Sequence, residues 1–255
     1  MECIASCGSG HVGGVLSIAD LLAVLYGKIM NIDSSNPLWE ERDRLVMSKG
    51  HCGPALYAAL ALKGFFPIEE LRTLNQNGTR LPSHCNTLTP GVDFSTGSLG
   101  QGASLAVGVA LALKKKNNPA RTFLILGDGE CNEGQIWESA MFAAHYGLDN
   151  IIAFVDQNKQ QLDGDTRDVM SMENLEESFL SFGWFVKKVA GHNLEKIEEA
   201  ILNAIENKGK PSLIVLDTIK GKGWTGAEGK PKVHHLPFTE KDLEILKNEI
   251  GLLGD

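Results

Sequence analysis

The sequence predicts an α/β fold in which a mostly parallel β-sheet is covered by helices on both faces. Short apolar runs of strand length alternate with longer stretches of helical periodicity. Such alternation is typical of a parallel sheet with crossover helices. Two of the runs are nearly continuous, as expected for strands buried on both faces. The predicted strands are residues 122–126, 151–156, 184–189 and 212–219.

Three helical patterns precede the first of these strands. Residues 16–30 place apolar residues on one helical face, and Ser17 with Asp20 resembles a capping box. Residues 54–64 begin with proline, which suits a first helical turn, and stop at a glycine. Residues 101–116 are apolar almost all round, which predicts a deeply buried helix.

Further helical patterns separate and follow the strands. The Gly/Lys-rich segment 221–238 is expected to be an exposed loop, and Thr239 is a plausible N-cap for a last helix. Because we find no linker, low-complexity tract or internal repeat, we interpret residues 1–255 as one domain. The helices predicted in this part are residues 134–147, 171–183, 193–209 and 239–251.

The composition excludes several classes of function. The chain has 255 residues and a formal net charge of −8 with acids and bases mixed, which argues against nucleic acid or another polyanion as a partner. It contains no apolar run long enough to predict a membrane span, and its first residues lack the pattern of a signal peptide. The 5 cysteines form no C-x-x-C pair, which favours reduced thiols and a cytoplasmic location over a disulfide framework.

Polar side chains follow two neighbouring predicted strands. Asp128 lies between two glycines after strand 122–126, and Asn158 follows strand 151–156. Ligands of open α/β sheets bind outside the carboxyl ends of the strands. Carboxylate and amide oxygens suit Mg²⁺, which fills its other positions with phosphate and water oxygens. The alternative is a simple turn, since aspartate forms turns readily, but the second strand-end residue favours the metal site.

Five ordered motifs resemble the transketolase family. Gly127-Asp128-Gly129, followed after 28 residues by Asn158, is similar to the thiamine diphosphate motif. The segments GSGHVGG, MSKGHCGPALYAAL, STGSLGQG, GDGECNEGQIWESA and DQNKQQLDG look like transketolase in order and spacing. The resemblance implies the thiamine diphosphate-binding domain, and with it the N-terminal subunit of a split transketolase. The pyrimidine-binding and C-terminal domains are then expected on a separate chain.

The resemblance also implies a set of ligands. Asp128, Asn158 and the main-chain carbonyl of Gln160 would bind Mg²⁺, which Ca²⁺ or Mn²⁺ could replace. The metal, one main-chain amide and two histidines would hold the diphosphate, while the backbone of a turn would meet the aminopyrimidine. The cofactor contacts implied in this way are Gly129 for the amide, His51 and His234 for the histidines, and Gly97, Ser98 and Leu99 for the turn.

His11, His84 and His234 would line the substrate channel and act in catalysis. Transfer of a two-carbon ketol unit needs proton transfers at hydroxyl and carbonyl oxygens, and imidazole both gives and takes protons near neutral pH. His235 competes with His234 for this role, since a slip of one residue in the match exchanges them.

Two glutamates follow the Gly-Asp-Gly turn. Glu133 matches a family glutamate that faces its copy across a dimer interface near both cofactors, which makes it a candidate catalytic residue. Its structural alternative is a capping acid at the start of the next helix. Glu130 has no such match and is expected to be solvated. His145 and His192 lie in no motif and are expected to be structural or on the surface.

Activity is expected to need a second chain. In this family the glutamate that activates the cofactor comes from the aminopyrimidine domain, so we expect two copies of this chain together with two copies of a C-terminal partner subunit. The substrates would be sugar phosphates of the pentose phosphate pathway or of specialised carbohydrate metabolism, including branched or sulfonated sugars. The alternatives are a subunit like deoxyxylulose-phosphate synthase or a 2-oxo acid dehydrogenase α subunit, or a cofactor-binding or regulatory subunit without catalytic activity.

The sequence departs from the family pattern at several points. Val12 stands where proline is usual, and Cys85 stands in a segment where Gly-His-Pro is usual. Arg80 is the candidate for an arginine that binds the acceptor phosphate. The helix that normally precedes GSGH is nearly absent, which predicts an incomplete N-terminus.

Overall fold

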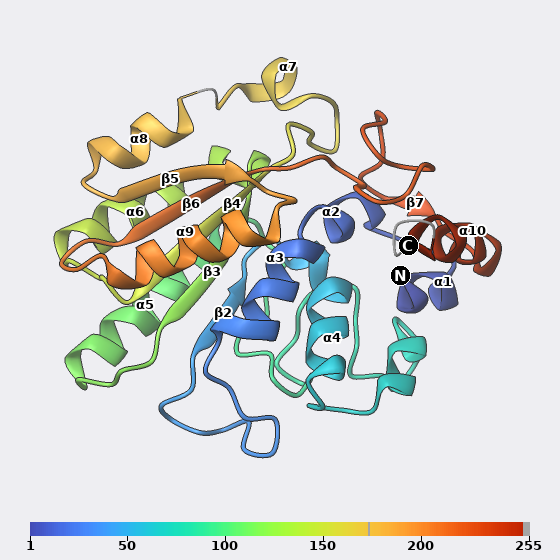
Figure 1. The fold of residues 1–255 in the computed structure, drawn as a ribbon, viewed down its shortest axis with the longest axis horizontal. Helices are drawn as coiled ribbons and strands as arrows, with labels where there is room; N and C mark the ends of the chain where they lie inside the picture. Colours follow the sequence, from blue (N-terminus) through green and yellow to red (C-terminus); the bar gives the residue numbers. More distant parts are fainter. Residues whose placement is uncertain (173, 252–255) are drawn as a thin grey trace.

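A five-stranded parallel sheet forms the centre of the computed structural model, which describes residues 1–172 and 174–251 (Figure 1). The strand order is β2-β3-β4-β6-β5, and each neighbouring pair is parallel. The predicted α/β fold is therefore confirmed. The strands are β2 (Arg44–Met47), β3 (Thr122–Gly127), β4 (Ile151–Gln157), β5 (Phe185–Ala190) and β6 (Ser212–Asp217).

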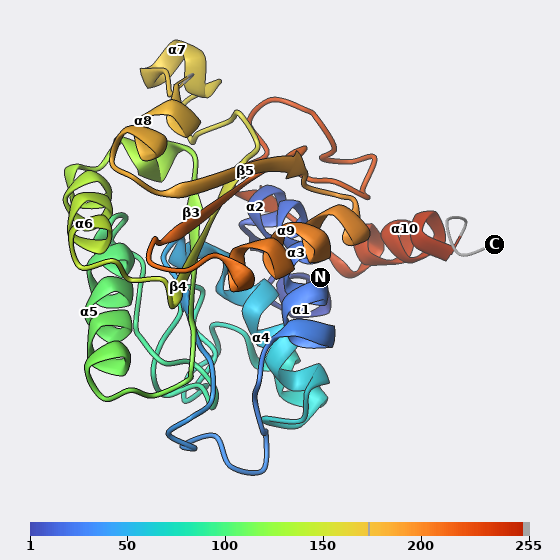
Figure 2. The ribbon, with the colours of Figure 1, turned by 60° about the vertical axis from the view of Figure 1, so that its left-hand side comes forward.

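Helices cover both faces of this sheet, as the two ribbon views show (Figures 1 and 2). Side chains alternate along β3, so Phe123 and Ile125 join the core on one face while Leu124 and Leu126 join the core on the other. One face carries α3 (Ala19–Val24) and α9 (Leu194–Glu206), and the other carries α5 (Gln101–Lys115), α6 (Gly134–His145) and α8 (Leu175–Ser181).

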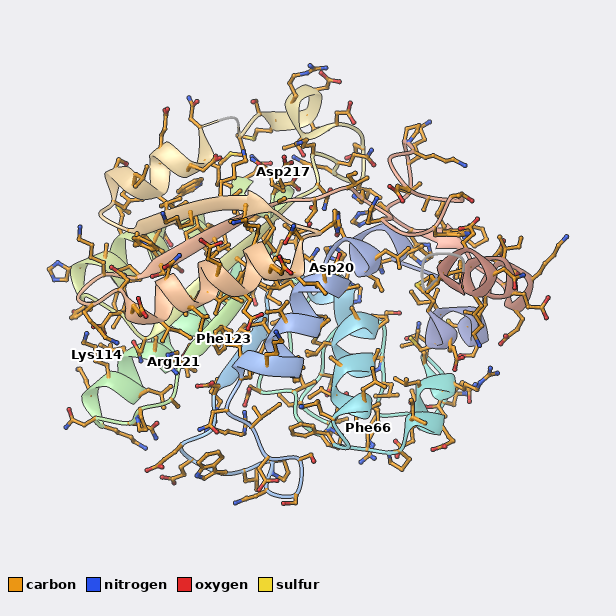
Figure 3. All side chains as sticks on the ribbon, in the orientation of Figure 1. Asp20, Phe66, Lys114, Arg121, Phe123 and Asp217 are labelled. Carbon is orange, nitrogen blue, oxygen red and sulfur yellow. The ribbon has the colours of Figure 1, made fainter. Side chains whose placement is uncertain are left out.

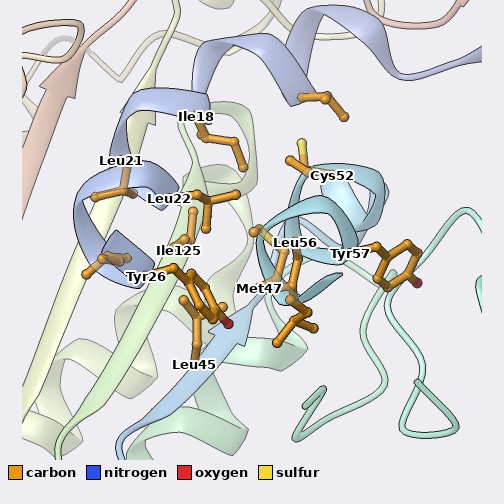
Figure 4. Close-up of a cluster of buried hydrophobic side chains, with 14 of the residues drawn as sticks. Ile18, Leu21, Leu22, Tyr26, Leu45, Met47, Cys52, Leu56, Tyr57 and Ile125 are labelled. Carbon is orange, nitrogen blue, oxygen red and sulfur yellow. The ribbon is translucent and has the colours of Figure 1, made fainter. Parts of the chain in front are cut away.

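The core on the α3 side extends to α4 (Gly53–Leu62), as Figure 4 shows. Ile18 and Leu22 belong to the same cluster of buried side chains as Leu56 of α4 and Ile125 of the sheet. Burial of such a side chain contributes roughly 1.5–3 kcal/mol, so this packing fixes the position of α4 against the sheet.

A small two-stranded sheet lies outside the main one. β1 (Ser9–Gly10) pairs antiparallel with β7 (Leu236–Pro237), with Gly10 opposite Leu236. His11 follows β1 and His234 and His235 precede β7, so this pairing brings the two histidine segments together. Nearby lie α1 (Glu2–Cys7), η3 (Ile68–Thr73) and α10 (Glu240–Gly251).

Short elements complete the fold and flank the ends of the strands. No helix within residues 1–172 and 174–251 is long and apolar enough to span a membrane. All five cysteines are free thiols. The short elements are α2 (Val12–Ser17), the π-helix η1 (Leu25–Ile29), the 3₁₀ helices η2 (Gly50–Cys52) and η4 (Gly129–Asn132), and α7 (Thr166–Met170).

The predicted capping box of Ser17 and Asp20 is wrong. The helical stretch is broken at Ile18, and no side chain caps α3. The hydroxyl of Ser17 donates instead to the carboxylate of Asp156 at 2.5 Å and lies 3.0 Å from the carbonyl of Gly14. The carboxylate of Asp20, labelled in Figure 3, binds Nδ1 of His192 at 2.7 Å. Both residues therefore connect segments other than the helix start that they were expected to cap.

The predicted deep burial of the helix at residues 101–116 is also wrong, because α5 is buried on one side only. Ala103, Ala106 and Ala110 are buried, whereas Leu105 is 37% exposed. The apolar residues on the outer side of this helix mimic the pattern of a fully buried one.

Segment 221–238 is not the exposed loop that its composition predicts. Trp224, Val233 and Phe238 are buried in the main core, and the Trp224 and Phe238 rings meet edge to face. The N-cap at Thr239 is confirmed, since its hydroxyl oxygen accepts from the amide of Asp242 at 3.4 Å while its own amide donates to the carboxylate of Asp242 at 2.8 Å. The segment that carries His234 is therefore anchored at both ends.

Candidate active site

Asp128 and Asn158 lie side by side beyond the carboxyl ends of β3 and β4. Gly127 is opposite Asp156 in the register of the two strands, so the residues that follow reach the same edge of the sheet. The carboxylate of Asp128 is only 4% exposed. It accepts hydrogen bonds from the amides of Gly129 at 2.8 Å and Lys159 at 2.6 Å.

Burial perturbs the ionisation of Asp128. Burial first, and the nearby Asp156 carboxylate second, raise the pKa of Asp128 from an ordinary 3.8 to about 6, although two amide donors oppose the shift. A raised pKa means that the ionised form of this carboxylate lacks enough positive charge nearby to stabilise it. A divalent cation beside Asp128 would supply that charge, which is the first sign that the residues fit a metal ion.

Asn158 and Gln160 supply further oxygens at the same place. The side-chain nitrogen of Asn158 donates to Asp156 at 2.8 Å, and its oxygen accepts from the amide of Gln160 at 3.1 Å. The main-chain carbonyl of Gln160 accepts from the ammonium group of Lys220 at 2.8 Å. Over residues 1–172 and 174–251, no three His, Cys, Asp or Glu side chains form a metal cluster. A donor set with one carboxylate suits Mg²⁺ that completes its shell with phosphate oxygens.

Two glycines leave room for close approach to these groups. A Cβ added to Gly129 would lie 2.8 Å from the side chain of Gln161, and one added to Gly14 would lie 2.9 Å from Sγ of Cys52. Real Cβ atoms do not approach other atoms so closely, so a side chain at either position would have to displace its neighbours. Glycine therefore keeps the backbone at these two positions free of side chains, which suits a diphosphate that approaches the main chain.

The predicted histidines converge on one place. The ring of His11 is 5.2 Å from the ring of His51, 5.5 Å from His84 and 5.2 Å from His234, measured between centroids. His51 and His234 are 5.0 Å apart. His235 also lies against His11, at 4.9 Å. Segments separated by most of the length of the domain thus place their imidazoles within contact of one another.

Three of these imidazoles favour the neutral form, namely those of His11, His51 and His234. Burial, followed by the neighbouring histidines and Lys220, lowers the pKa of His11 to about 3. Burial and Lys220 lower that of His234 to about 4. Burial and the charge of Lys49 also lower the pKa of His51 well below its usual range. Neutral rings can both donate and accept hydrogen bonds, which suits contact with sugar hydroxyls.

A cavity of about 290 Å³, here called the histidine cavity, joins the histidines to the strand-end oxygens. Ten of the predicted site residues line it, and His234 lines it whereas His235 does not. The lining residues are His11, Gly14, Lys49, His51, His84, Gly97, Leu99, Gly127, Asp128, Gly129, Glu130, Asn158, Gln160, Gln161, Leu162, Lys220 and His234.

Ser98 and Glu133 do not line this cavity. Ser98 lies between Gly97 and Leu99, which do line it. Glu133 is exposed at the N-cap position of α6, where an acid suits the helix dipole, although its side chain makes no capping hydrogen bond. It packs beside Gly100, where an added Cβ would lie 2.9 Å from Cβ of Glu133.

The prediction that Glu130 is solvated is wrong. Its side chain is buried, with 2% exposure, and accepts hydrogen bonds from Ser48 and from the amides of Gly100 and Gly127. Burial raises the pKa of Glu130, and these donors oppose that rise. Glu130 thus fixes the Gly127 turn to the segment that holds Gly97 and Leu99.

Two buried lysines were missed by the sequence analysis. Lys49 follows β2, and its ammonium group pairs with Asp156 at 2.5 Å. Lys220 follows β6 and lies 3.3 Å from Nδ1 of His234. Both positions come shortly after strand ends at the same edge of the sheet, so the rule that pointed to Asp128 could also have found them.

A larger cavity of about 580 Å³ adjoins the histidine cavity. The two share Asp128, Asn158, Gln160 and Lys220. The larger one has no histidine in its lining, so the groups suited to proton transfer belong to the smaller one.

Other residues singled out in the sequence lie away from the histidine cavity. His145 is on α6. His192 is structural, because its Nδ1 binds Asp20 and its Nε2 accepts from the amide of Ile219 at 2.8 Å. Arg80 forms a two-pronged ion pair with Glu70, at 2.7 and 2.9 Å. None of these histidines or arginines lines the histidine cavity.

Comparison with known proteins identifies the family of this chain. The transketolase thiamine diphosphate-binding domain family matches residues 1–254. The 6-deoxy-6-sulfo-D-fructose transketolase subunit SqwG of Clostridium sp. (strain MSTE9) is 55% identical over 242 residues, which is 94% of this chain and 88% of that protein. One of the subunits of the apulose-4-phosphate transketolase of Phocaeicola vulgatus is 39% identical over 251 residues, 98% of this chain and 89% of that protein.

A solved structure extends the comparison to the fold. Transketolase from Campylobacter jejuni has a TM-score of 0.92 and 34% identity, and the match covers 98% of this chain and 40% of that one. The chain spans about two fifths of that transketolase. Its whole described fold is thus shared with one part of a longer enzyme. The chain belongs to the transketolase family and carries its thiamine diphosphate-binding domain.

Proposed function

We propose that this chain is the diphosphate-binding subunit of a two-subunit transketolase. The observation that carries the proposal is the histidine cavity, in which neutral imidazoles adjoin the oxygens of Asp128 and Asn158. Thiamine diphosphate, when bound, carries the two-carbon ketol unit from the donor ketose to the acceptor aldose. The residues of this chain bind the cofactor and serve proton transfer around it.

Mg²⁺ would be held by Asp128, Asn158 and the main-chain carbonyl of Gln160. These oxygens adjoin the same cavity, and the raised pKa of Asp128 supports a cation there. The amide of Gly129 would be shared between Asp128, to which it donates, and the diphosphate. Lys220, buried beside the carbonyl of Gln160, would add a positive charge for the diphosphate.

The histidines would have different roles according to how deeply they are buried. His51 is largely buried and would donate a hydrogen bond to the diphosphate. His11 and His234 are half-buried and His84 is exposed, so these three would meet the sugar at the open side of the cavity. Neutral imidazoles there can take a proton from a hydroxyl and return it to a carbonyl oxygen. A bound diphosphate would raise the lowered pKa values of His11 and His234, because an anion favours imidazolium.

The activating acid would come from the partner subunit. Among the described residues, the carboxylates that line the histidine cavity are those of Asp128 and Glu130. Asp128 is assigned to the metal, and Glu130 is engaged by three donors. The proposal therefore includes a C-terminal subunit with the pyrimidine-binding domain, two copies of each chain, and exposed Glu133 near the contact between copies. The five free thiols are consistent with the expected cytoplasmic location.

For the donor we propose 6-deoxy-6-sulfo-D-fructose, named in the relative that is 55% identical. The second candidate is a sugar phosphate, since another relative is named for apulose 4-phosphate at 39% identity. Arg80 is paired with Glu70 and does not line the histidine cavity, so the partner subunit would bind the anionic end of the sugar.

Reconstitution with the partner subunit tests the proposal. The chain is mixed with the pyrimidine-domain subunit, Mg²⁺, thiamine diphosphate and an acceptor aldose phosphate, and each donor is offered in turn: the sulfosugar, xylulose 5-phosphate and pyruvate. Removal of two carbons from the sulfosugar leaves a four-carbon aldose that retains the sulfonate, which mass spectrometry detects. Turnover of pyruvate alone would contradict the transketolase assignment. Turnover by this chain without a partner would contradict the need for a second chain, and binding without any turnover would favour a regulatory subunit.

A further inference from the structure

A fully buried carboxylate, Asp156, lies beneath the proposed metal site. Its side chain is 0% exposed, and Asp156 is the first residue of the motif DQNKQQLDG, in which it was given no role. Four side chains from four segments donate to it. Its Oδ2 accepts from Ser17 and Lys49, each at 2.5 Å, and from Asn158 at 2.8 Å, while its Oδ1 accepts from Thr218.

Asp156 is an acceptor for every one of these groups. The ammonium group of Lys49 forms an ion pair with it at 2.5 Å, and the hydroxyls of Ser17 and Thr218 lie against the same carboxylate. The lysine is 1% exposed, so water does not weaken the pair. An ionised carboxylate is a hydrogen-bond acceptor at both oxygens and a donor at neither.

Because Asp156 only accepts hydrogen bonds, it sets the orientation of the Asn158 side-chain amide. Asp156 can only accept, so the nitrogen of the Asn158 amide must face it. The main-chain amide of Gln160 can only donate, so the oxygen of Asn158 must face in that direction, where it accepts at 3.1 Å. Asp156 and the amide of Gln160 together exclude the flipped orientation of the Asn158 side chain, in which its nitrogen would take the place of the oxygen that binds the metal.

We propose that Asp156 is a positioning residue that holds the oxygen of Asn158 toward the divalent cation. This inference rests on the proposed function, because it needs Asn158 to be a metal ligand. Ser17 and Thr218 hold the carboxylate itself, so the orientation of one ligand depends on α2 and on the end of β6. Groups of this kind orient ligands without touching the metal.

The alternative is that the pair of Lys49 and Asp156 only supports the fold. Two double variants separate these roles, since both remove the two charges. Lys49→Met with Asp156→Asn keeps an oxygen that can accept from Asn158, whereas Lys49→Met with Asp156→Leu removes that acceptor. A buried pair replaced as a unit leaves no charge unpaired, so both variants are designed to fold.

The test uses Mn²⁺ as the probe, titrated into the reconstituted complex with thiamine diphosphate and followed by electron paramagnetic resonance of the free ion. We expect the Asp156→Leu double variant to bind Mn²⁺ about 10-fold or more weakly than the Asp156→Asn double variant. The leucine variant should also be the less stable of the two in urea, because Ser17, Thr218 and Asn158 lose their acceptor, so Mn²⁺ is titrated under conditions in which both variants are folded. Equal Mn²⁺ affinity in the two double variants would overturn the inference.

A single variant covers the case in which the leucine variant does not fold. Thr218→Val keeps both charges and releases one oxygen of Asp156, so Mn²⁺ binding should weaken about threefold or more. Wild-type affinity in this variant would overturn the inference. Asp128→Ala tests the proposed function separately: if it retains wild-type Mn²⁺ affinity, the metal assignment fails, whatever the Asp156 variants do.

Discussion

Acid should destabilise the fold through the histidines of the cavity. His11, His51 and His234 have pKa values below the ordinary 6.5 in the folded chain. A base whose pKa is depressed by folding contributes stability that is present above the unfolded pKa and is lost as the pH falls toward the folded one. The loss therefore begins near pH 6.5 and grows on further acidification.

The size of this effect follows from the linkage between protons and folding. At pH 5, a fully buried neutral histidine costs about 2 kcal/mol of unfolding free energy. His11 and His234 are half-buried, so solvent screening reduces each share to about 1 kcal/mol, and the three together cost about 4 kcal/mol. Asp128 acts in the opposite direction, because its pKa of about 6 returns roughly 1 kcal/mol between pH 7 and 5. The net loss is about 3 kcal/mol.

Urea unfolding at pH 7 and pH 5 measures this loss. His51→Gln removes the most buried of these rings, so the variant should lose about 2 kcal/mol less than the wild type between the two pH values. His145→Gln is the matched control, because His145 is a histidine outside the cavity, and it should behave as the wild type does. An equal loss in His51→Gln and the wild type would refute the reasoning.

Three further predictions concern binding and stability. Asp128→Ala should abolish Mg²⁺-dependent thiamine diphosphate binding in the reconstituted complex, measured by titration calorimetry, while circular dichroism shows the fold intact. Lys220→Met should weaken cofactor binding about tenfold or more, because it removes a charge-assisted contact, with a thermal melt to exclude unfolding. Glu130→Ala should lower the unfolding free energy by about 2–4 kcal/mol, since it leaves the amides of Gly100 and Gly127 without their acceptor, and Glu130→Gln should cost less in the same urea titration.

Each of these has an outcome that contradicts it. Unchanged cofactor affinity in Asp128→Ala would remove the metal assignment. Unchanged cofactor affinity in Lys220→Met would mean that Lys220 does not contact the diphosphate and only donates to the carbonyl of Gln160. Equal stability of Glu130→Ala and the wild type would mean that water replaces the side chain at no cost.

The sequence allowed the central strands and the strand-end site to be predicted for physical reasons. β3 and β4 are buried on both faces, so their apolar runs are nearly continuous and stand out from their surroundings. The general rule for open α/β sheets then directs attention to Asp128 and Asn158. β2 was not predicted, because it has four residues and begins with Arg44, so its run of apolar residues is too short to recognise as a strand.

The polar groups beneath the site could not be predicted in the same way. A glutamate such as Glu130 is normally solvated, and its burial here depends on Ser48 and Gly100, which lie 82 and 30 residues away. Asp156 is paired with Lys49 over 107 residues of sequence. Local patterns carry no information on such partners, and a buried charge becomes tolerable only once the fold has brought them together.

One cavity contains a carboxylate with a raised pKa and histidines with lowered pKa values. Together these shifts support a divalent cation bound to a diphosphate better than either shift does alone. Burial and Asp156 raise the pKa of Asp128, so at that end the cavity is short of positive charge. Burial and the lysines lower the pKa values of His51 and His234, so at the other end it is short of negative charge. A single ion would relieve one of these deficits and worsen the other. A divalent cation bound to a diphosphate relieves both, provided that the metal lies at Asp128 and the phosphates lie toward the histidines and Lys220.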